Sequence, residues 1–543
     1  MCRFVLTMEP ENAEAMHLLG IIAHQMGRNE QAIDWIRRAI RVTPDNPAYH
    51  CNLGEVLRAM HRLEEAVSSY RRALEIAPAT PEVHNNLGNA LRSQGDLAGA
   101  VEAYHRAIEF HPNYAEAYAN LGSALSHLGQ FDKAASACQR ALEIWPDFAP
   151  AYNNLGVALA AEGRFGEAIV AFRQALQLLP SLASAHKNLG DALKEIGAFA
   201  EADSAFRTAL DLHPTYANAG FSRSLLRLLL GDFEAGLPAY ELRHQVFRQN
   251  QRGFSQPMWD GSPLQRQQIL VHAEQGFGDA IQFVRYAPMV AERGGEVIVE
   301  CPSELVALFS GMKGVSEVIA YGESLPAFGL QVPMLSLPLL FRTTPESIPA
   351  GVPYLFADPR LSTEWARRLD EHSSQLRVGL AWASNPKNRQ ARKRDIGFPL
   401  LEPLLKIDGI DFFSLQIGKG AEQMQVLPEA AGMIDHTAHI KDFSDMAAFM
   451  SQLDLIISVD TAVPHLAGAL GRPAWTLLAH IPDWRWGVAG EKTPWYPTMR
   501  LFRQPAPGEW APVIRRVSEE LAVTARAFHA NLNSQKARGK DLV

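Results

Sequence analysis

The chain has 543 residues, of which 47% are hydrophobic, and this length predicts about three or four domains of about 150 residues with sizeable cores. Its formal net charge is -8. Proteins that bind nucleic acid usually carry a basic excess, so the charge argues against nucleic acid as the main partner.

The cysteines and the apolar stretches indicate the compartment. The four cysteines, Cys2, Cys51, Cys138 and Cys301, are far apart and form no CxxC pair, which argues against a disulfide framework and a cysteine metal site. The amino-terminal MCRFVLTMEPENAEA has one arginine and an apolar stretch too short for a signal peptide, and no apolar run approaches the roughly 20 residues of a membrane helix. We therefore expect a soluble, cytoplasmic protein.

The first part of the chain repeats with a period of 34 residues, as NLGNALRSQGDLAGAVEAYHRAIEFHP (86–112) and NLGVALAAEGRFGEAIVAFRQALQLLP (154–180) show. Glycine, alanine and proline recur at this spacing, at Gly20, Gly54, Gly88, Gly122, Gly156 and Gly190, at Ala32, Ala66, Ala100, Ala134, Ala168 and Ala202, and at Pro44, Pro78, Pro112, Pro146, Pro180 and Pro214. The pattern resembles the tetratricopeptide repeat, a pair of antiparallel helices. We expect a helical superhelix over residues 1–248, whose seventh, degraded unit has Ser224 in place of the glycine.

An asparagine recurs just before the buried leucine of five repeats, at Asn52, Asn86, Asn120, Asn154 and Asn188. Asparagine is a mediocre helix former, so helix propensity does not explain it. The position tends to face the concave groove in this repeat family, and the array resembles that of the protein O-GlcNAc transferases, which carry such a ladder. The amides either pair with the backbone of an extended peptide acceptor or bond neighbouring repeats. Leu18 and Ser222 interrupt the ladder at its two ends.

Strands and helices alternate after a polar linker over residues 249–264. The expected elements are strands at 269–273 and 296–301 and helices at 279–293 and 303–312. Such alternation predicts a parallel, doubly wound sheet, and we expect a first Rossmann-like half over residues 265–360.

A second Rossmann-like half is expected over residues 361–530, before a polar tail at 531–543. Its elements are an opening strand in LRVGLAWASNP (376–386), strands at 411–418 and 455–459, helices at 443–453 and 463–470, a last strand at 473–480 and a helix at 510–528. Two such halves around a cleft resemble the GT-B glycosyltransferases. The absence of a GxGxxG or Walker lysine motif argues against dinucleotide oxidoreductases and P-loop proteins.

The stretch ISVDTAVPHLAGALGRP (457–473) ends a strand at Asp460 and starts a helix at once. A helix start presents free N–H groups and a positive dipole end, which suit a pyrophosphate. Thr461 adds a hydroxyl, and His465 reaches the same anion or a sugar hydroxyl unless it is only packed. The segment resembles the nucleotide-sugar site of the heptosyltransferase-like family, in which an aspartate, a threonine and a glycine precede the histidine. Ala462 stands here in place of that glycine.

A basic run in ASNPKNRQARKRDIGFP (383–399) follows the first strand of the second half. Its cations are Lys387, Arg389, Arg392, Lys393 and Arg394. Although a charge run is usually a solvated face, cations at a strand exit can neutralise a diphosphate leaving group. In the resembled family a basic residue before a short aromatic-proline element contacts the phosphates, and Arg394 is the nearest match, with Lys393 as the alternative. Gln416, at the end of its strand, is placed to touch the ribose or base.

The stretch AEQGFGDAIQFVRYAP (273–288) opens a helix on the side of the first half. Inverting transfer needs a carboxylate to accept the proton of the acceptor, and in the resembled family a glycine-aspartate at this turn supplies it. Asp279 is the expected base and Glu274 the fallback, whereas a helix-capping role is the alternative for Asp279. The same turn also holds Gln275, Gln282 and Arg285.

The loop HIPDWRWGV (480–488) places Asp483, Trp484 and Trp486 at the cleft edge. We expect the tryptophans to pack the joint between the halves rather than to stack on a base or sugar. No cluster has the spacing of metal ligands, and GT-B enzymes generally work without a metal. Neither a metal nor a cofactor is therefore expected.

The two parts together resemble the bacterial repeat-fused glycosyltransferases. The resemblance implies an inverting, metal-independent enzyme that moves a hexosyl, heptosyl or N-acetylhexosaminyl group from a nucleotide-sugar to a protein presented by the array. One alternative is a surface glycan or lipid-linked acceptor, with the array binding an assembly partner. Another is a non-catalytic scaffold with a decayed transferase half. The sequence leaves the sugar, the nucleotide, the acceptor and a homodimer open.

Overall fold

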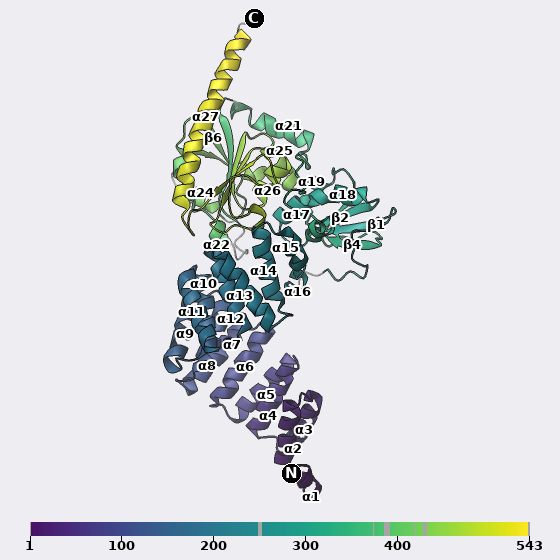
Figure 1. Cartoon of the computed structure of the whole chain (residues 1–543), viewed down its shortest axis with the longest axis vertical. Coiled ribbons are helices and arrows are strands. Elements are labelled where there is room, and N and C mark those ends of the chain that lie inside the picture. Colours follow the sequence, from purple (N-terminus) through teal and green to yellow (C-terminus); the bar gives the residue numbers. More distant parts are fainter. Residues whose placement is uncertain are drawn as a thin grey trace. The chain divides into compact units, whose positions relative to one another are not determined.

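The computed structural model describes residues 2–247, 252–372, 374–384, 391–418, 420–426 and 432–540 (Figure 1). The chain forms two compact units, Met1–Tyr216 and Ala217–Val543. The first unit is helical throughout its described residues, and the second combines helices with two parallel β-sheets.

Six helix pairs follow the short helix α1 (Cys2–Met8) in the described part of the first unit. They are α2 (Ala13–Gln25) with α3 (Asn29–Val42), α4 (Pro47–Ala59) with α5 (Leu63–Ile76), α6 (Pro81–Gln94) with α7 (Leu97–Phe110), α8 (Ala115–His127) with α9 (Phe131–Ile144), α10 (Ala149–Ala161) with α11 (Phe165–Leu178), and α12 (Ala183–Glu195) with α13 (Phe199–Leu212). Each pair occupies one repeat period, so the predicted helical array is confirmed.

The recurrent glycine lets the two helices of a repeat approach closely. A Cβ atom at Gly54 would lie 2.7 Å from the ring of Tyr70, and one at Gly156 would lie 2.5 Å from the ring of Phe172. Contacts this short are repulsive, so a side chain at these positions would force the helices apart. The glycine and the large residue sixteen positions later therefore form one packing unit.

The second unit begins with a seventh helical pair, α14 (Ala217–Leu229) and α15 (Phe233–Tyr240), and with the short α16 (Arg243–Val246). The rings of Phe233 and Tyr240 pack against Trp484, with centroids 5.7 and 6.0 Å apart. These helices, which the sequence pattern assigns to the array, thus belong to the compact unit of the α/β part.

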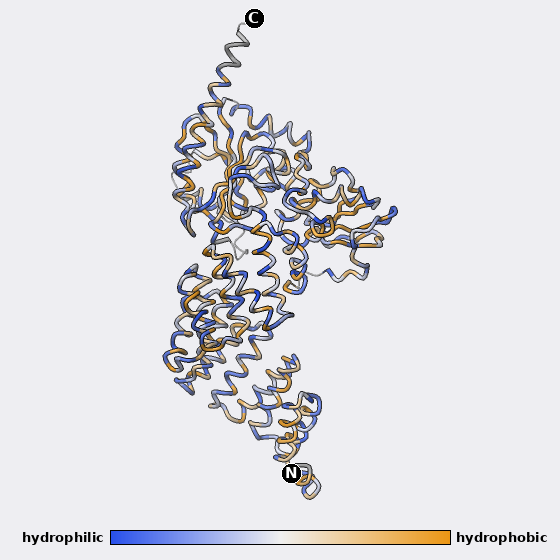
Figure 2. Tube along the Cα trace, viewed as in Figure 1, coloured by the Kyte–Doolittle hydropathy of each residue, from blue (hydrophilic) through white to orange (hydrophobic). Residues whose placement is uncertain are grey.

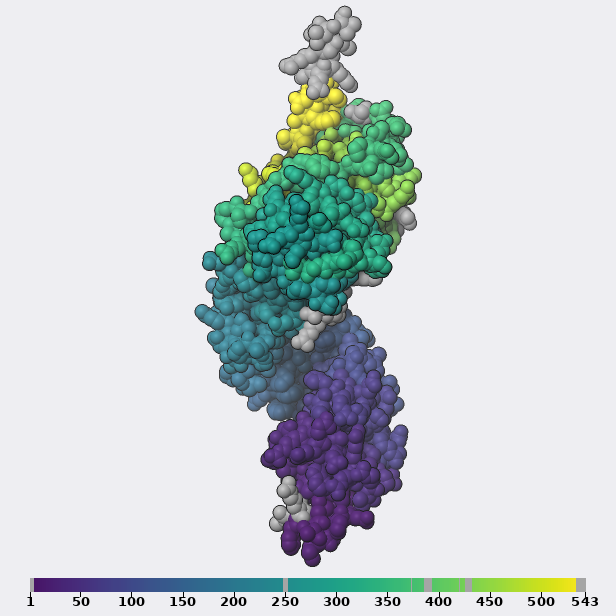
Figure 3. Space-filling view, turned by 90° about the vertical axis from the view of Figure 1, so that its right-hand side faces the viewer, coloured from purple at the N-terminus to yellow at the C-terminus, as the bar shows by residue number. Residues whose placement is uncertain are grey.

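The first sheet is parallel, with strand order β3-β2-β1-β4. Its elements are β1 (Gln268–His272), β2 (Glu296–Cys301), β3 (Val315–Ala320), β4 (Leu330–Pro333), α17 (Phe277–Phe283), α18 (Ala287–Glu292), α19 (Ser303–Phe309) and α20 (Leu337–Leu340), with 3₁₀ turns η2 (Val284–Tyr286) and η3 (Met334–Ser336). The single helix expected over 279–293 is interrupted at η2, because Pro288 has no N–H to donate four residues back. Residues of this half, in teal, lie at the front of the second unit in the view of Figure 3.

The second sheet is also parallel, with strand order β10-β9-β8-β5-β6-β7. Its strands are β5 (Leu376–Ala381), β6 (Ile410–Ser414), β7 (Met433–Ile434), β8 (Leu455–Val459), β9 (Ala474–Leu478) and β10 (Met499–Arg503). Its helices and 3₁₀ turns are α21 (Pro359–Arg368), η4 (Asp370–His372), α22 (Ala391–Arg394), η5 (Phe398–Leu401), α23 (Glu402–Leu405), α24 (Glu422–Val426), η7 (Thr437–His439), α25 (Phe443–Met450), α26 (Ala462–Ala469), η8 (Trp484–Trp486) and α27 (Trp510–Lys540).

Two expectations about this half are wrong. The strand at 473–480 is not the last one, because β10 pairs with β9 at the sheet edge. The sequence did not predict β10 because two of its five residues are arginines. Arg500 pairs with Glu491 and Glu520, and Arg503 donates to backbone carbonyls of the loop at 486–490. The last helix does not end at residue 528 but continues to Lys540, since the stretch beyond it has no proline and many good helix formers.

Helices cover both faces of the second sheet, and hydrophobic residues concentrate on its central strands (Figure 2). Successive strand residues point to opposite faces. Phe412 of β6 joins the core that α27 covers through Val513, Val517 and other residues. Its neighbour Phe413 contacts Phe449 of α25, with ring centroids 6.0 Å apart. Burial on both faces explains why all five residues of the strand LIISV are buried and all but Ser458 are apolar.

Candidate functional site

A cleft of about 1150 Å³ lies between the two α/β halves of the second unit. Its walls are the turn at the start of α17, the ends of β5, β6 and β8, the start of α26 and the loop after β9. The carboxyl ends of parallel strands are where open α/β sheets bind ligands. The predicted turns at Asp279 and Asp460 both line this cleft.

The amino-terminal ends of α17 and α26 meet at the cleft. A Cβ atom at Gly278 would lie 3.0 Å from Cδ2 of His465 and 3.5 Å from Cα of Ala462, so a side chain there would press on the His465 ring. Thr461 caps α26, and its hydroxyl accepts a hydrogen bond from the N–H of Val463 at 3.3 Å. The positive ends of two helix dipoles are thus directed at one place.

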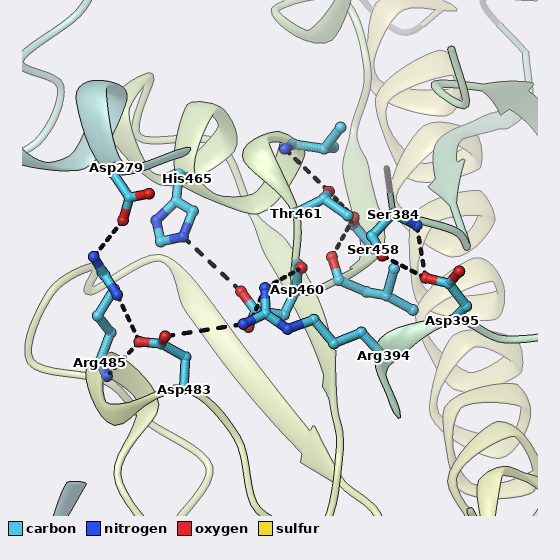
Figure 4. Close-up of polar contacts among 12 residues, drawn as sticks. Asp279, Ser384, Arg394, Asp395, Ser458, Asp460, Thr461, His465, Asp483 and Arg485 are labelled. Atoms are coloured by element: carbon cyan, nitrogen blue, oxygen red, sulfur yellow. Dashed lines mark hydrogen bonds and ion pairs between the residues drawn. The ribbon is translucent and has the colours of Figure 1, made fainter. Parts of the chain in front are cut away.

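Asp279 and Arg485 form an ion pair across the cleft. The N–H of Gly276 donates to the other oxygen of Asp279 at 3.2 Å, so this carboxylate also caps α17, as its alternative interpretation predicted. Nη1 of Arg485 donates to Asp483 at 2.7 Å. Figure 4 shows Arg485 between the two carboxylates.

Arg394 continues this chain of charges. Its guanidinium lies 3.9 Å from Asp483 and 3.4 Å from Asp460, and Asp460 lies 4.0 Å from Nε2 of His465 (Figure 4). The side chains of Asp460 and His465 are each only 7% exposed. A continuous network of buried and half-buried side chains thus joins the proposed base to the proposed donor site.

Burial controls the ionisation of this network. It raises the pKa of Asp279 above its ordinary value, and the attraction of Arg485 offsets only part of that rise. It likewise raises the pKa of Asp460, which Arg394 opposes. Burial also disfavours the charge of Asp483, but Arg485 and Arg394 outweigh it and lower the pKa of that carboxyl.

His465 is a neutral imidazole in this environment, because burial lowers its pKa well below the ordinary value and Arg485 lowers it further. Its Nδ1 lies 3.0 Å from the hydroxyl of Tyr496. Burial raises the pKa of Tyr496, so the phenol keeps its proton and can donate it to Nδ1. In the tautomer that accepts this bond, the ring proton lies on Nε2, which faces Asp460.

The basic run is only partly described. Lys387 and Arg389 lie outside the described residues, as does the side chain of Arg392. Lys393 is half-buried and is not among the described residues that line the cleft, whereas Arg394 is. Arg394 therefore matches the predicted position better than Lys393.

Two contacts fix the backbone beside Arg394. The N–H and hydroxyl of Ser384 donate to Asp395 at 2.7 and 2.6 Å, which ties the end of β5 to the start of the segment after α22. Gln416 accepts from the N–H groups of Trp382 and Ala383 at 3.0 and 2.9 Å, and donates to the carbonyl of Ala383 at 3.0 Å. Gln416 lines the cleft, but these bonds hold its amide on the backbone.

Glu274, the fallback base, pairs with Arg243 of α16 at 3.0 Å and is not among the described residues that line the cleft. Arg243 is 2% exposed and also contacts Glu241 and Ser336. The structure therefore does not bring Glu274 together with Asp279. Its role there is to join α16 to the end of β1.

The three other residues that the sequence analysis named at this turn lie in different places. Gln275 lines the cleft, and Gln282 is fully buried. Arg285 donates to the carbonyl of Trp495 at 2.9 Å and to the hydroxyl of Tyr354 at 3.0 Å. It thus ties the two halves together beneath the cleft.

The residues after β9 include one that the sequence analysis missed. Trp484 packs against Phe283 of the first half, with ring centroids 6.3 Å apart, as expected for the joint between the halves. Trp486 instead stacks on His465 of its own half, with centroids 5.1 Å apart. Arg485 between them was passed over, although it bonds Asp279 and Asp483. The spacing of Asp483 and Arg485 in DWRW was the one available signal.

The ladder asparagines bond neighbouring repeats. The amide groups of Asn120 and Asn188 donate to Asn85 and Asn153, both at 2.9 Å. Asn154 donates to the carbonyl of Ala119 at 3.0 Å, and Asn52 lies 2.7 Å from His17. Asn86 occupies the same half-buried position in its repeat. One of the two interpretations, bonding between repeats, is thus observed, and a peptide groove stays a prediction.

In the described part of the chain, no group of three or more His, Cys, Asp or Glu residues is arranged to hold a metal ion. Within the same residues, no helix combines the length and the apolar character that crossing a membrane requires.

Comparisons with known proteins match both parts of the chain. The family described as TPR repeat matches residues 20–61, 55–91 and 88–129, and the family described as Tetratricopeptide repeat matches residues 113–181 and 147–215. The family described as Glycosyltransferase family 9 (heptosyltransferase) matches residues 437–507. The chain thus combines tetratricopeptide repeats with a C-terminal segment, residues 437–507, that matches glycosyltransferase family 9.

A curated relative and solved structures are also similar. Protein FlbA of Caulobacter vibrioides is 29% identical over 328 residues, which are 55% of this chain and 54% of FlbA, so the chain spans about half the length of this relative. A crystal structure of MamA is 27% identical over 29% of this chain and 93% of its own, with a TM-score of 0.28. A crystal structure of PilW is 22% identical over 38% of this chain and 96% of its own, with a TM-score of 0.35.

Proposed function

We propose that the chain is an inverting, metal-independent glycosyltransferase of the GT-B type, which moves a sugar from a nucleotide-sugar to an acceptor bound by the repeat array. One observation carries the proposal. The segment that matches glycosyltransferase family 9 contains the Asp460 turn and α26, and this turn shares a cleft with Asp279.

The donor diphosphate binds at the start of α26. There the N–H of Ala462, the hydroxyl of Thr461 and the helix dipole favour an anion. Arg394, which lines the same cleft, stabilises the charge that develops on the leaving diphosphate. The Nε2–H of the neutral His465 donates a hydrogen bond to a phosphate or sugar oxygen.

Asp279 acts as the general base on the opposite wall. The acceptor oxygen attacks C1 of the sugar while its proton passes to Asp279, and the C1–oxygen bond breaks with its electron pair leaving on the diphosphate. Attack from the side opposite the leaving group inverts the anomeric configuration. Burial keeps Asp279 more basic than an exposed aspartate, which suits this role.

The acceptor is a protein or peptide, because tetratricopeptide repeats are protein-interaction modules. The ladder asparagines still offer their carbonyl oxygens to an extended backbone. A surface glycan or lipid-linked acceptor, with the array binding an assembly partner, is the second candidate. A scaffold whose transferase half is inactive is the third.

A ligand screen tests the donor site first. Purified full-length protein is heated with UDP-, GDP-, ADP- and dTDP-sugars near one millimolar without metal, because a ligand of the folded state raises the melting temperature. We expect one nucleotide class to raise it, and His465→Ala to abolish the rise. No rise with any of the sugars would favour the scaffold.

Asp279→Asn then tests catalysis with the donor so identified. The variant should still bind the donor and lose transfer by at least about a hundredfold, the usual range for a general base. Unchanged turnover would remove Asp279 as the base. Substitution of the five ladder asparagines by alanine should lower transfer to a protein acceptor, and equal transfer would leave the ladder a purely structural role.

A further inference from the structure

The proposed base is engaged in the ligand-free structure. Arg485 donates to Oδ1 of Asp279, and the N–H of Gly276 donates to Oδ2 at 3.2 Å. Hydrogen bonds to a carboxylate favour its charged form and so weaken it as a base. Asp279 therefore becomes a stronger base when it loses one of these partners.

The charge balance of the network identifies what can remove that partner. Three carboxylates, those of Asp279, Asp460 and Asp483, face two guanidinium groups, those of Arg394 and Arg485. The network thus already holds one negative charge in excess. A diphosphate adds further negative charge at the same place, so its binding requires a guanidinium to change partners.

Arg485 is suited to that exchange. It lines the cleft, and its side chain is only 6% exposed, so a charge interaction there is weakly screened. Its Nε is buried and has no hydrogen-bond partner among the described residues, which leaves a donor available for a ligand. An arginine fork binds phosphate oxygens with two parallel hydrogen bonds.

We propose that Arg485 is a ligand of the donor diphosphate, that Asp279 holds it in the free protein, and that donor binding frees Asp279 to act as the base. This inference rests on the proposed function. It implies a preferred order, in which the donor binds first and thereby makes Asp279 a stronger base for the acceptor.

Inorganic pyrophosphate tests the exchange without knowledge of the sugar or nucleotide. Its affinity is measured by titration calorimetry with the full-length chain and with Arg485→Gln, Asp279→Asn and the double variant. Arg485→Gln should weaken binding about tenfold, since it removes a phosphate ligand. Asp279→Asn should strengthen it several-fold, because Arg485 no longer has to leave a charged partner.

The double variant distinguishes the exchange from a general effect of charge. If Asp279 acts through Arg485, Asp279→Asn has little effect on the pyrophosphate affinity once Arg485 is glutamine. The effect of Asp279→Asn should therefore differ several-fold between the wild-type and Arg485→Gln proteins, as is usual for residues in contact. Glu304→Gln is the matched control, because Glu304 lines the same cleft and bonds the hydroxyl of Ser303. It should leave the affinity nearly unchanged.

Arg485→Lys covers the risk that the glutamine variant does not fold. Lysine keeps the charge but cannot bridge two partners, so it should also weaken binding. The proposal is overturned if wild-type protein does not bind pyrophosphate at millimolar concentration. It is also overturned if Arg485→Gln and Arg485→Lys bind pyrophosphate as tightly as wild type, or if Asp279→Asn changes the affinity equally in the wild-type and Arg485→Gln proteins.

The outcomes for the two proposals are separable. A chain that transfers sugar but shows no coupling between Asp279 and Arg485 keeps the proposed function and loses the exchange. A chain that binds no nucleotide-sugar loses the proposed function, and the pyrophosphate titrations then report only whether the two residues share an anion site.

Discussion

His465 shows how one residue is tuned by its surroundings. The ring lies between Trp486 and Tyr496, and only 5% of the residue is exposed. Its pKa is lowered, so folding removes its ability to take up a proton near neutral pH. The same burial that prepares a neutral hydrogen-bond donor therefore links stability to pH.

The linkage has a definite sign. The unfolded chain protonates this histidine below about pH 6.5, whereas the folded chain does not until a much lower pH. Stability is therefore full above that value and falls as the pH falls, by up to about 1.4 kcal/mol per pH unit for one such proton. His465→Gln should reduce the loss of stability between pH 7.5 and 5.5.

Urea unfolding followed by tryptophan fluorescence measures this effect. Only Trp35 and Trp145 of the ten tryptophans lie in the first unit, so the signal reports mainly the second. His439→Gln, at an exposed position of the second unit, is the control and should behave like wild type. Equal pH slopes for wild type and His465→Gln would contradict the prediction.

Sequence reasoning reached the residues at the Asp460 turn because the signal is local: a buried strand, a cap and a helix follow one another. Arg485 gave no comparable signal, since its partner Asp279 lies 206 residues away. An arginine between two tryptophans also suggests packing at the joint between the halves, and this does not reveal its ion pair with Asp279. Long-range ion pairs are the part of the site that the sequence alone does not predict.

At the scale of elements, the repeat glycines set how closely two helices pack. A Cβ atom added at any of the six glycines from Gly20 to Gly190 would lie 2.4–2.7 Å from a side-chain atom of the next helix. The facing residue is an aromatic residue, an isoleucine or a cysteine. Helix propensity alone would favour alanine here. Steric fit therefore overrides propensity at these positions.

Gly156→Ala should destabilise the first unit by about 1–3 kcal/mol, because its methyl group would collide with the ring of Phe172. Phe172→Leu creates space, so the double variant should be more stable than the sum of the two single effects. Urea unfolding followed by circular dichroism at 222 nm measures both.

Gly166→Ala is the matched control in the next helix, α11. No atom lies within 4 Å of the added Cβ, so alanine should stabilise by up to about 1 kcal/mol through its better helix propensity. If both alanines had the same effect, the close contact at Gly156 would not explain the glycine.

Prediction of elements succeeded where the pattern repeats. Glycine, alanine and proline at a fixed period identify each helix pair from its own residues. The break at η2 and the strand β10 were missed, because the first depends on one missing N–H at Pro288 and the second on arginines paired with Glu491 and Glu520. The periodicity of hydrophobic residues reveals neither a single missing N–H group nor an ion pair with a residue distant in sequence.

On the scale of the whole molecule, the seventh repeat belongs to the second unit. Phe233 and Tyr240 pack on Trp484, and Arg243 pairs with Glu274. Trp484 directly precedes Arg485, and Glu274 directly precedes the turn that leads to Asp279. The seventh repeat therefore supports both walls of the cleft.

Two fragments test this dependence. Residues 217–543 should fold and keep the tryptophan unfolding midpoint of the full chain. Residues 249–543 lack α14–α16, so Glu274 loses its partner and Trp484 is exposed, and the loss of a buried ion pair alone costs about 3–5 kcal/mol. We expect this shorter fragment to be strongly destabilised. Equal midpoints for both fragments would show that the seventh repeat is not needed.

The position of the junction bears on how such a chain can change over generations. Unequal recombination adds or removes DNA in whole periods, here 34 residues, wherever repeats are alike. Because α14–α16 make the junction inside the second unit, an event anywhere before Ala217 leaves the contacts of that unit untouched. The array is therefore free to lengthen or shorten, while the cleft of the second unit is inherited intact.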